Sequence, residues 1–354
     1  MTALVGPNGV GKTNLLEAVG YLATLGSHRP GQEAALVRAG ADAAVIRAAA
    51  VRSGRTMLLE LEIRPGNGVR GRVNRASVPR SRDLLGIVRA VLFAPEDLAL
   101  VRGDPEERRR FLDTLAVQRL PRYLAVRQDY ERILRQRNTL LRSAGGRLPA
   151  GTGLATLDVW DDKLAAAGAE LWVERLRLVR LLSPLVERSY QELAACSEPV
   201  GVAYASAVLG DVVADPDPEP SVLARALRDR LISGRAREVE RGVTLSGPHR
   251  DDLVLSVQEL PARTHASHGE AWSLALALRV ASHRLLAAEG EEPVLLLDDV
   301  FAELDRKRRE QVAAVAANAE QAIVTTAVAE ELPSHLRASM FHVEPGSIRA
   351  AETT

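Results

Sequence analysis

The feature that most constrains the fold is a glycine-rich segment near the start of the chain, residues 6–13 (GPNGVGKT). It satisfies the pattern G-x-x-x-x-G-K-[ST], in which backbone N–H groups surround a phosphate and the following helix directs its positive end toward it. Residues 2–5 are typical of the end of a strand, and the apolar residues after the loop have helical spacing. This strand, loop and helix predict an α/β fold that binds a nucleotide.

The pattern predicts what individual residues of the loop bind. Lys12 would reach the β- and γ-phosphates, and the hydroxyl of Thr13 would bind Mg²⁺. Lys12 is also one of only three lysines in the chain. The alternative is a glycine-rich turn without a ligand, which the strand and helix on either side disfavour. The residues expected to surround the nucleotide are Gly6, Pro7, Asn8, Gly9, Val10, Gly11, Lys12 and Thr13.

The second half of the expected site lies near the other end of the chain. The apolar run at residues 294–297 is typical of a strand buried on both faces, and it is followed by Asp298 and Asp299. Asp298 would hold Mg²⁺ through water, and Asp299 would orient or deprotonate the attacking water. We therefore expect Asp299 and Lys12 to be the catalytic residues. A helix-capping pair at a strand end is the alternative, which the phosphate loop makes much weaker.

A third segment, Ser267-His268-Gly269-Glu270, opens an apolar helix just upstream of the acidic strand. On its own it is explained by a serine cap and a glycine. Its position is where a signature of the type S-x-G-[QE] belongs, whose serine and helix N-terminus grip the γ-phosphate of a nucleotide held by the other subunit. We expect Ser267, Gly269 and Glu270 to contact the nucleotide of a second copy, which requires an ATP-dependent homodimer.

Composition narrows the class of protein further. The chain has 354 residues with 46 basic and 46 acidic side chains, so no net charge draws it to nucleic acid or membrane. A single cysteine argues against a disulfide framework or a multi-cysteine metal site and fits a cytoplasmic location. We see no signal peptide and no apolar run long enough to span a membrane, so no membrane partner is expected. Aromatic residues make up only 3% of the chain, which argues against a base-stacking surface for single strands.

The order of strand and helix signals predicts a split domain. Strand signals occur at residues 43–51, 57–63, 69–73 and 90–93, and they resume at residues 243–245 and 253–257. Helical segments dominate between these two sets, with an expected break at Pro184. We therefore expect an α/β domain made of residues 1–94 and 242–354, with a mostly helical lobe, residues 95–241, inserted in it.

Four longer segments carry a resemblance to a known family. They are PEDLALVRGDPEERRRFLD at residues 95–113, YERILRQRNTLLR at 130–142, SGPHRDDL at 246–253 and LLLDDVFAELDRKRR at 295–309. Together with the phosphate loop they resemble the RecF family of bacterial recombination mediators, relatives of the SMC-type and ABC-type ATPases, over essentially the whole chain. The resemblance implies an α/β, ABC-type P-loop ATPase head with an inserted, mostly helical lobe.

The resemblance also implies a function. Family members bind ATP and Mg²⁺, dimerise on ATP and clasp double-stranded DNA at single-strand gap junctions, and slow hydrolysis releases them. The chain would then be a weak, DNA-stimulated ATPase that supports recombinase loading in DNA repair and replication with the RecR and RecO proteins. ATPases of this type usually carry glutamate as the second acid. Asp299 is one methylene shorter, which suggests slow turnover.

Further positions follow from the resemblance. Asp305 falls in the loop that touches the partner subunit. Thr325 and Thr326 occupy the switch position, where transporter relatives place histidine, so Thr325 is expected near the γ-phosphate. Arg29, after the first helix, is similar to an arginine that contacts phosphate or DNA, although a surface arginine explains it equally well.

Positive charge gathers in the first part of the helical lobe. Residues 102–147 hold twelve arginines against six acidic residues in an otherwise neutral chain. Such a surface can bind DNA phosphates without reading bases, and we expect Arg108, Arg109 and Arg110 to contribute to it. The alternative is a solvated helical face, in which some of these arginines pair with the acids of the helix start.

Other interpretations stay open. A transporter ATPase subunit would have a compact helical lobe, a glutamine lid loop and a switch histidine, where this chain has a larger insertion, Glu96 and Thr325. A clamp that uses ATP without hydrolysing it is a third possibility. At the turn containing His249 we favour a structural network with Asp251 over DNA contact. RecF-like chains begin with a strand pair that this sequence lacks, so we expect weak ATP binding or weak folding from an uncovered sheet edge.

Overall fold

The computed structural model divides the chain into two compact units and describes residues 1–26, 36–66, 68–146, 152–194, 198–210, 215, 218–333 and 339–351. The first unit comprises Met1–Val101, Leu185–Pro199 and Ala266–Thr354, and the second comprises Arg102–Pro184 and Val200–His265. These boundaries differ from the expected insertion at residues 95–241. Residues 242–265 belong to the second unit because the strand Asp252–Val257 pairs there with Val200–Ala205.

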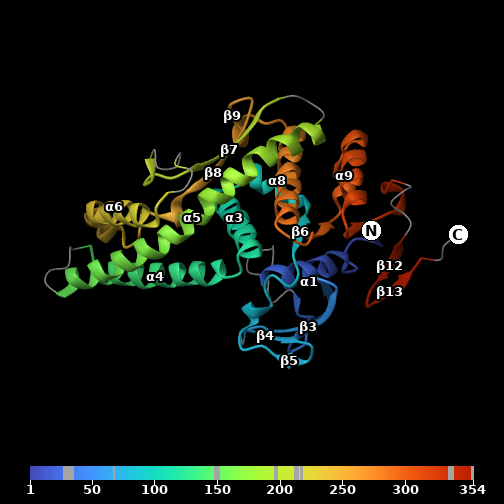
Figure 1. Ribbon diagram of the computed structural model, residues 1–354, viewed down its shortest axis with the longest axis horizontal. Helices are drawn as coiled ribbons and strands as arrows, with labels where there is room; N and C mark the ends of the chain where they lie inside the picture. The colour runs from blue at the N-terminus through green and yellow to red at the C-terminus, as the bar shows by residue number, and fades with distance from the viewer. Residues whose placement is uncertain are drawn as a thin grey trace. The chain divides into compact units, whose positions relative to one another are not determined.

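The first unit is built on a six-stranded sheet in the order β13-β12-β1-β11-β10-β6. Its strands are β1 (Thr2–Val5), β6 (Ala90–Phe93), β10 (Val294–Leu297), β11 (Ala322–Thr326), β12 (Met340–Glu344) and β13 (Ser347–Ala350). All pairs are parallel except the hairpin of β12 and β13. Segments from both ends of the sequence thus form one sheet (Figure 1), and the carboxyl ends of β1, β10 and β11 lie along the same edge.

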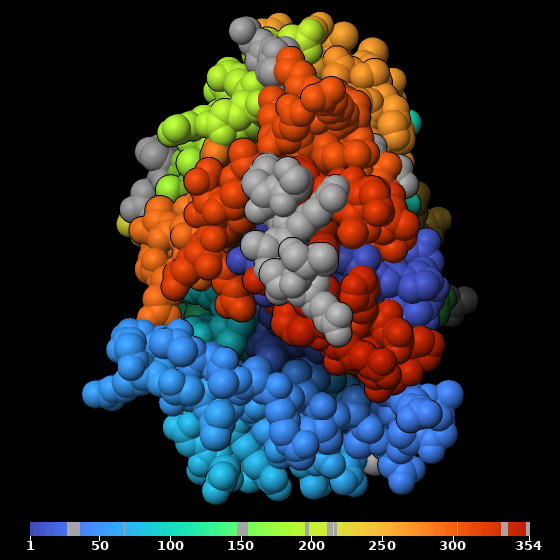
Figure 2. Space-filling model, turned by 90° about the vertical axis from the view of Figure 1, so that its right-hand side faces the viewer, coloured from blue at the N-terminus to red at the C-terminus, as the bar shows by residue number. Residues whose placement is uncertain are grey.

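A second sheet of this unit is antiparallel and four-stranded, in the order β2-β3-β4-β5. Its strands are β2 (Ala44–Arg52), β3 (Arg55–Arg64), β4 (Gly68–Val73) and β5 (Ala76–Ser77). They form the expected hairpins, and Figure 2 shows the sheet in light blue below the red β12–β13 hairpin. Alternate residues of β3 are buried against Tyr21 and Leu22 of helix α1 (Lys12–Thr24), as the period of a half-buried strand requires.

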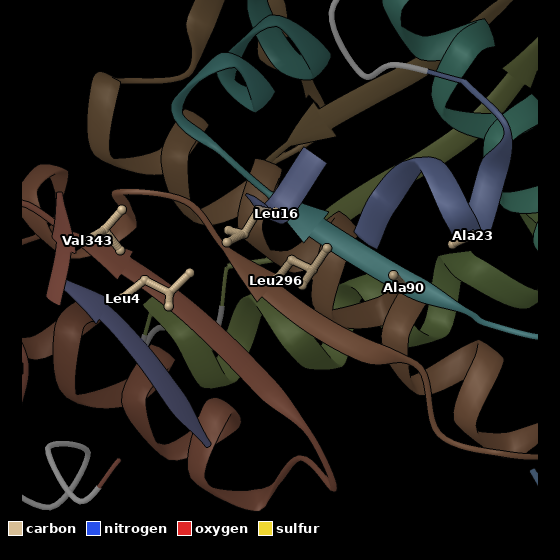
Figure 3. Close-up of a cluster of buried hydrophobic side chains, with 6 residues drawn as sticks. All are labelled: Leu4, Leu16, Ala23, Ala90, Leu296 and Val343. Carbon is tan, nitrogen blue, oxygen red and sulfur yellow. The ribbon is translucent and has the colours of Figure 1, made fainter. Parts of the chain in front are cut away.

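Helix α1 packs on the six-stranded sheet through its apolar stripe. Leu16 and Ala23 lie in one buried cluster with Leu4 of β1 and Leu296 of β10 (Figure 3). Burial of a side chain such as Leu16 stabilises the fold by about 2 kcal/mol. The cluster therefore fixes both ends of the loop that joins β1 to α1.

The remaining helices of the first unit position two further segments of the expected site. Helix α8 (His268–Ala288) is buried along most of its length, and α9 (Arg306–Asn318) follows the acidic strand. A short helix, α2 (Leu98–Arg102), follows β6. Single 3₁₀ turns are found at Ser81–Leu84, Pro95–Asp97, Val300–Glu303 and Ala329–Glu331.

The second unit is mostly helical. It contains α3 (Pro105–Arg119), α4 (Tyr123–Ser143), α6 (Pro220–Arg241), α7 (Ala262–His265) and the 3₁₀ turn Pro248–Arg250. Its small sheet consists of β7 (Val200–Ala205), β8 (Asp252–Val257) and β9 (Leu260–Pro261). Strand β7, which is rich in small residues, was not predicted from the sequence. Among the described residues, no helix is both long enough and apolar enough to cross a membrane.

Two local predictions are wrong. Helix α5 (Thr152–Ala194) continues through Pro184, although this residue is where the second unit ends and the first resumes. Proline removes one helical hydrogen bond, and the buried Leu182 and Val186 on either side keep the helix packed. The expected strand at residues 243–245 does not form, because the N–H groups of Thr244 and Leu245 donate to side chains of α4 and α6 and that of Val243 donates to a carbonyl of α6.

His249 lies in a buried polar network of the second unit. Its Nδ1 is 2.7 Å from the hydroxyl of Tyr130, and its Nε2 is 3.2 Å from the carbonyl oxygen of Thr244. A carbonyl only accepts, so Nε2 carries the proton and Nδ1 accepts from Tyr130. Asp251 accepts from Trp172 Nε1 at 2.5 Å. These bonds favour the structural interpretation of the turn over DNA contact.

This network predicts a loss of stability in mild acid. Burial lowers the pKa of His249 to about 4, whereas an exposed imidazole has a pKa of about 6.5. As the pH falls, the unfolded chain binds the proton first, so stability is lost between about pH 6.5 and about pH 4. We expect this histidine to lower the free energy of unfolding by about 2 kcal/mol between about pH 7 and about pH 5.

Urea unfolding at the two pH values measures the effect. His249→Gln should flatten this part of the pH dependence, whereas the same substitution at exposed His265 should leave it as in the parent protein. Equal pH slopes for His249→Gln and the parent would contradict the assignment.

Candidate nucleotide site

The loop between β1 and α1 takes a backbone conformation that glycine adopts readily and other residues do not. Gly9 and Gly11 have φ angles of +85° and +103°, in the left-handed region. Gly6 meets another constraint, because a Cβ atom there would lie 2.3 Å from the carbonyl oxygen of Val343. The glycines of the pattern therefore allow the chain to turn sharply into α1 and leave the N–H groups at the helix start available to a ligand.

Lys12 is the first residue of α1 and is only 3% exposed. Its Nζ donates to the carbonyl oxygens of Gly6 at 2.8 Å and Pro7 at 3.3 Å, and to Asn8 Oδ1 at 3.4 Å. The same nitrogen lies 3.9 Å from Asp299 Oδ1. The loop thus holds a buried positive charge beside the acidic pair.

The acidic pair follows β10, and the parallel neighbour β11 brings Thr325 beside it. Thr325 Oγ1 donates to Asp298 Oδ1 at 2.6 Å and accepts from the Asp299 N–H at 2.9 Å. Thr13 Oγ1 also donates to Asp298 Oδ1, at 3.2 Å, although 285 positions separate the two residues in the sequence. Five residues that the sequence assigned to one site, Lys12 among them, therefore lie together.

Asp299 has the character of a proton acceptor. Its backbone is left-handed, with φ +48°, a conformation that aspartate tolerates better than most residues. Burial raises the pKa of its carboxyl, the charge of Lys12 opposes the rise and that of Asp298 adds to it. A carboxylate with a raised pKa is the stronger base at neutral pH, so Asp299 is suited to take a proton from water.

These residues form a set of donors and acceptors that fits a magnesium nucleotide. Lys12 and the N–H groups at the start of α1 suit phosphate oxygens. The hydroxyl of Thr13 and the carboxylate of Asp298 are the hard oxygen ligands that Mg²⁺ prefers. Within the described part of the chain, no group of three or more His, Cys, Asp or Glu side chains could hold a metal ion. Mg²⁺ would then take its other ligands from phosphates and water, as nucleotide-bound magnesium usually does.

The segment at residues 267–270, here called the signature turn, starts helix α8. Ser267 Oγ accepts from the Glu270 N–H at 3.3 Å, and Glu270 Oε2 accepts from the Ser267 N–H at 2.6 Å. This reciprocal capping satisfies two backbone donors and lowers the pKa of Glu270, with Ser267 as the main cause. The side chain of Glu270 thus caps its own helix, a role that was not predicted from the sequence. Among the described residues, no hydrogen bond joins the signature turn to the phosphate loop of the same chain.

The arginines expected to contact DNA are engaged within the second unit. Arg108 is 4% exposed, and its guanidinium donates to Asp252 at 2.7 and 2.8 Å. Arg109 donates to a backbone carbonyl at 2.7 Å, and Arg110 pairs with glutamates of its own helix start. The structure therefore argues against Arg108 as a DNA contact, because its charge is buried and neutralised. Arg29 lies outside the described residues.

One residue at the signature turn was not predicted from the sequence. The guanidinium of Arg308, in the first turn of α9, lies against Gly269. Nothing in the sequence pattern relates two positions so far apart. Only the packing of α8 beside α9 brings them together.

Comparison with known proteins gives a consistent result. Residues 1–344 match the family model described as the RecF/RecN/SMC N terminal domain. The chain is 53% identical over 354 residues to the DNA replication and repair protein RecF of Streptomyces avermitilis, covering 98% of this chain and 93% of that protein. It is 54% identical over 353 residues to the protein of the same name from Frankia alni, covering 99% and 93%.

Solved structures agree with this likeness. A structure of the recombination mediator protein RecF with ATP, in the RecFOR pathway, has a TM-score of 0.87 at 26% identity and covers 99% of this chain and 91% of that one. A second structure of that mediator, RecF-ATPrS, has a TM-score of 0.88 at 25% identity, with the same coverage. An Smc head bound to the C-winged helix domain of ScpA, at 14% identity and a TM-score of 0.53, shares the fold alone.

Proposed function

Because this chain belongs to the RecF family, we propose that it is an ATP-dependent recombination mediator of DNA repair and replication. It binds ATP and Mg²⁺ at the phosphate loop, forms a homodimer and clasps duplex DNA at single-strand gap junctions. Slow, DNA-stimulated hydrolysis then releases the clasp. Recombinase loading follows with the RecR and RecO proteins. The similar solved structures are of the mediator RecF in the RecFOR pathway.

The observation that carries the proposal is the convergence of Lys12, Thr13, Asp298, Asp299 and Thr325 at one edge of a parallel sheet. A structural interpretation does not account for a buried lysine that bonds to loop carbonyls beside two carboxylates. A phosphate and a divalent cation would use all of these groups at once.

The chain's own residues suggest how hydrolysis proceeds. Bound Mg²⁺ would draw charge from the phosphate oxygens and so ease departure of the γ-phosphoryl group. Lys12 holds the phosphates, and Thr325 fixes the acidic pair through bonds to the Asp298 carboxylate and the Asp299 N–H. Asp299 accepts a proton from the attacking water.

The hydrogen bonds of the signature turn support the proposed dimer. Its described hydrogen bonds stay within α8, and none reaches the phosphate loop of the same chain. Ser267 is exposed, at the positive end of a long helix. These properties suit a surface that meets the γ-phosphate of a second copy.

DNA contact is proposed for the second unit. Arg109 and Arg110 are only partly exposed, so the phosphate contacts have to involve other cations as well. Arg122, Arg135 and Arg142, on or next to α4, are exposed and belong to the same arginine-rich stretch. Contacts of this kind position DNA without reading its sequence.

Sedimentation velocity tests the proposal as a whole. We expect a monomer without nucleotide and with ADP, a dimer with ATP and Mg²⁺, and a larger complex when gapped duplex DNA is added. A chain that remains monomeric with saturating ATP, both free and on DNA, would refute the proposal that a dimer closes around DNA.

Ser267→Arg should block dimer closure and leave ATP binding by the monomer intact. The bulky cation would occupy the space into which the second copy's nucleotide must enter, and it would remove the serine cap at a cost of about 1 kcal/mol. Sedimentation with ATP measures closure, and a fluorescent ATP analogue measures monomer affinity. If the variant monomer no longer binds ATP, the signature turn acts within its own chain.

A further inference from the structure

The guanidinium of Arg308 packs against Gly269 of the signature turn. A Cβ atom on Gly269 would lie 2.9 Å from Arg308 Nη2 and 3.1 Å from Nη1. The φ angle of Gly269 is not in the left-handed region, so its backbone does not itself require glycine. The absence of a side chain at this position leaves room for the guanidinium.

The guanidinium also bonds to residues at the starts of two helices, α8 and α9. Arg308 Nε donates to the hydroxyl of Ser273 in α8 at 2.9 Å, and Ser273 is only 1% exposed. Arg308 Nη1 lies 2.5 Å from Asp305 Oδ2, while Asp305 Oδ1 caps α9 by accepting from the Arg308 N–H at 3.0 Å. One side chain therefore joins the start of α8 to the start of α9.

We propose that Arg308 is a positioning residue that holds the signature turn and the loop at Asp305 as one rigid surface, so that both meet the second copy in register. The inference rests on the proposed function, because the surface acts only when two copies close on ATP. Charged hydrogen bonds and a planar guanidinium with several donors suit this task better than a lysine ammonium does.

The chain offers a matched control on the same helix. Arg306 has a side chain that is 94% exposed, and among the described residues its ion pair is with Glu310, one turn further along α9. Arg306→Ala removes the same charge from the same end of α9 without touching the signature turn. A general effect of positive charge would appear in both variants, whereas positioning would appear only at Arg308.

We expect Arg308→Ala to weaken ATP-driven dimerisation by about tenfold or more, with monomer affinity for an ATP analogue within about twofold of the parent protein. Arg306→Ala should dimerise like the parent, and Arg308→Lys should recover part of the loss. Sedimentation velocity over a range of protein concentrations gives the dimer dissociation constants, and thermal unfolding checks that each variant is folded.

Gly269→Ala tests the contact between Gly269 and Arg308 by changing Gly269 instead of Arg308. Its methyl group would displace the guanidinium, so it should weaken dimerisation, and the double variant should be little worse than either single one. This variant also carries the test if Arg308→Ala does not fold. Full dimerisation of folded Arg308→Ala or of Gly269→Ala, or losses that multiply in the double variant, would overturn the inference. A parent protein that stays monomeric with ATP would instead refute the proposed function.

Discussion

Replacing Lys12 with alanine should abolish ATP-driven dimerisation and weaken ATP binding by about 100-fold or more. The buried ammonium lies within reach of the site where the phosphates would bind, and it would exchange its bonds to the carbonyls of Gly6 and Pro7 for bonds to phosphate oxygens. Hydrogen bonds to charged groups contribute about 1.5–3 kcal/mol each, so two of them account for a factor of about 100 or more. Equilibrium binding of a fluorescent ATP analogue and sedimentation with ATP measure the two effects.

Lys163 provides the control for this substitution. Its ammonium lies 5.2 Å from the centre of the Trp160 ring in the second unit, where it has no part in the proposed site. Lys163→Ala should therefore bind ATP and dimerise as the parent protein does. A Lys12→Ala protein that still forms the dimer with ATP would contradict the assignment of the loop.

Asp299→Asn should slow ATP hydrolysis by about 10²–10⁴-fold, the usual contribution of a general base. Asparagine keeps the size of the side chain and its reach toward Lys12, so we expect ATP binding to change by no more than a few-fold. The ATP-bound dimer should then remain on DNA for much longer. Phosphate release measures the first effect, and dissociation from a labelled gapped duplex measures the second.

The pH dependence adds a second readout for Asp299. Because burial raises its pKa, the parent's hydrolysis rate should fall in acid at a higher pH than an ordinary carboxylate would give. The residual activity of Asp299→Asn should lack this decline. Faster release of DNA by the variant would argue against Asp299 as the base. A parent that releases no phosphate with or without DNA would indicate a clamp that uses ATP only for closure.

The elements of the first unit could be predicted because their signals are local. The strand-like runs at residues 43–51, 57–63 and 69–73 predicted β2, β3 and β4, and the apolar run that ends in the acidic pair predicted β10. The phosphate loop carries its structural context with it, since strand and helix both adjoin it. Parallel pairing of β10 with β11 then places Thr325 at the site without any further signal.

The remainder could not be predicted because it depends on partners far apart in sequence. Arg108 looks like a DNA contact in an arginine-rich stretch, and only the approach of Asp252 buries its charge. Residues 243–245 have side chains typical of a strand, but Asn138 and Glu238 accept hydrogen bonds from their backbone N–H groups. The role of Arg308 beside Gly269 is of the same kind, because it depends on how two helices pack.

The position of β1 inside its sheet has a consequence for how the protein is made. Its two neighbours are β11 and β12, so every backbone hydrogen bond that β1 makes to another strand connects it to residues beyond 321. A chain emerging from the ribosome therefore exposes the phosphate loop long before the strands that support it exist. Contacts of such long sequence separation form slowly. The loop that follows β1 therefore cannot take its folded form until residues 322–344 have been synthesised.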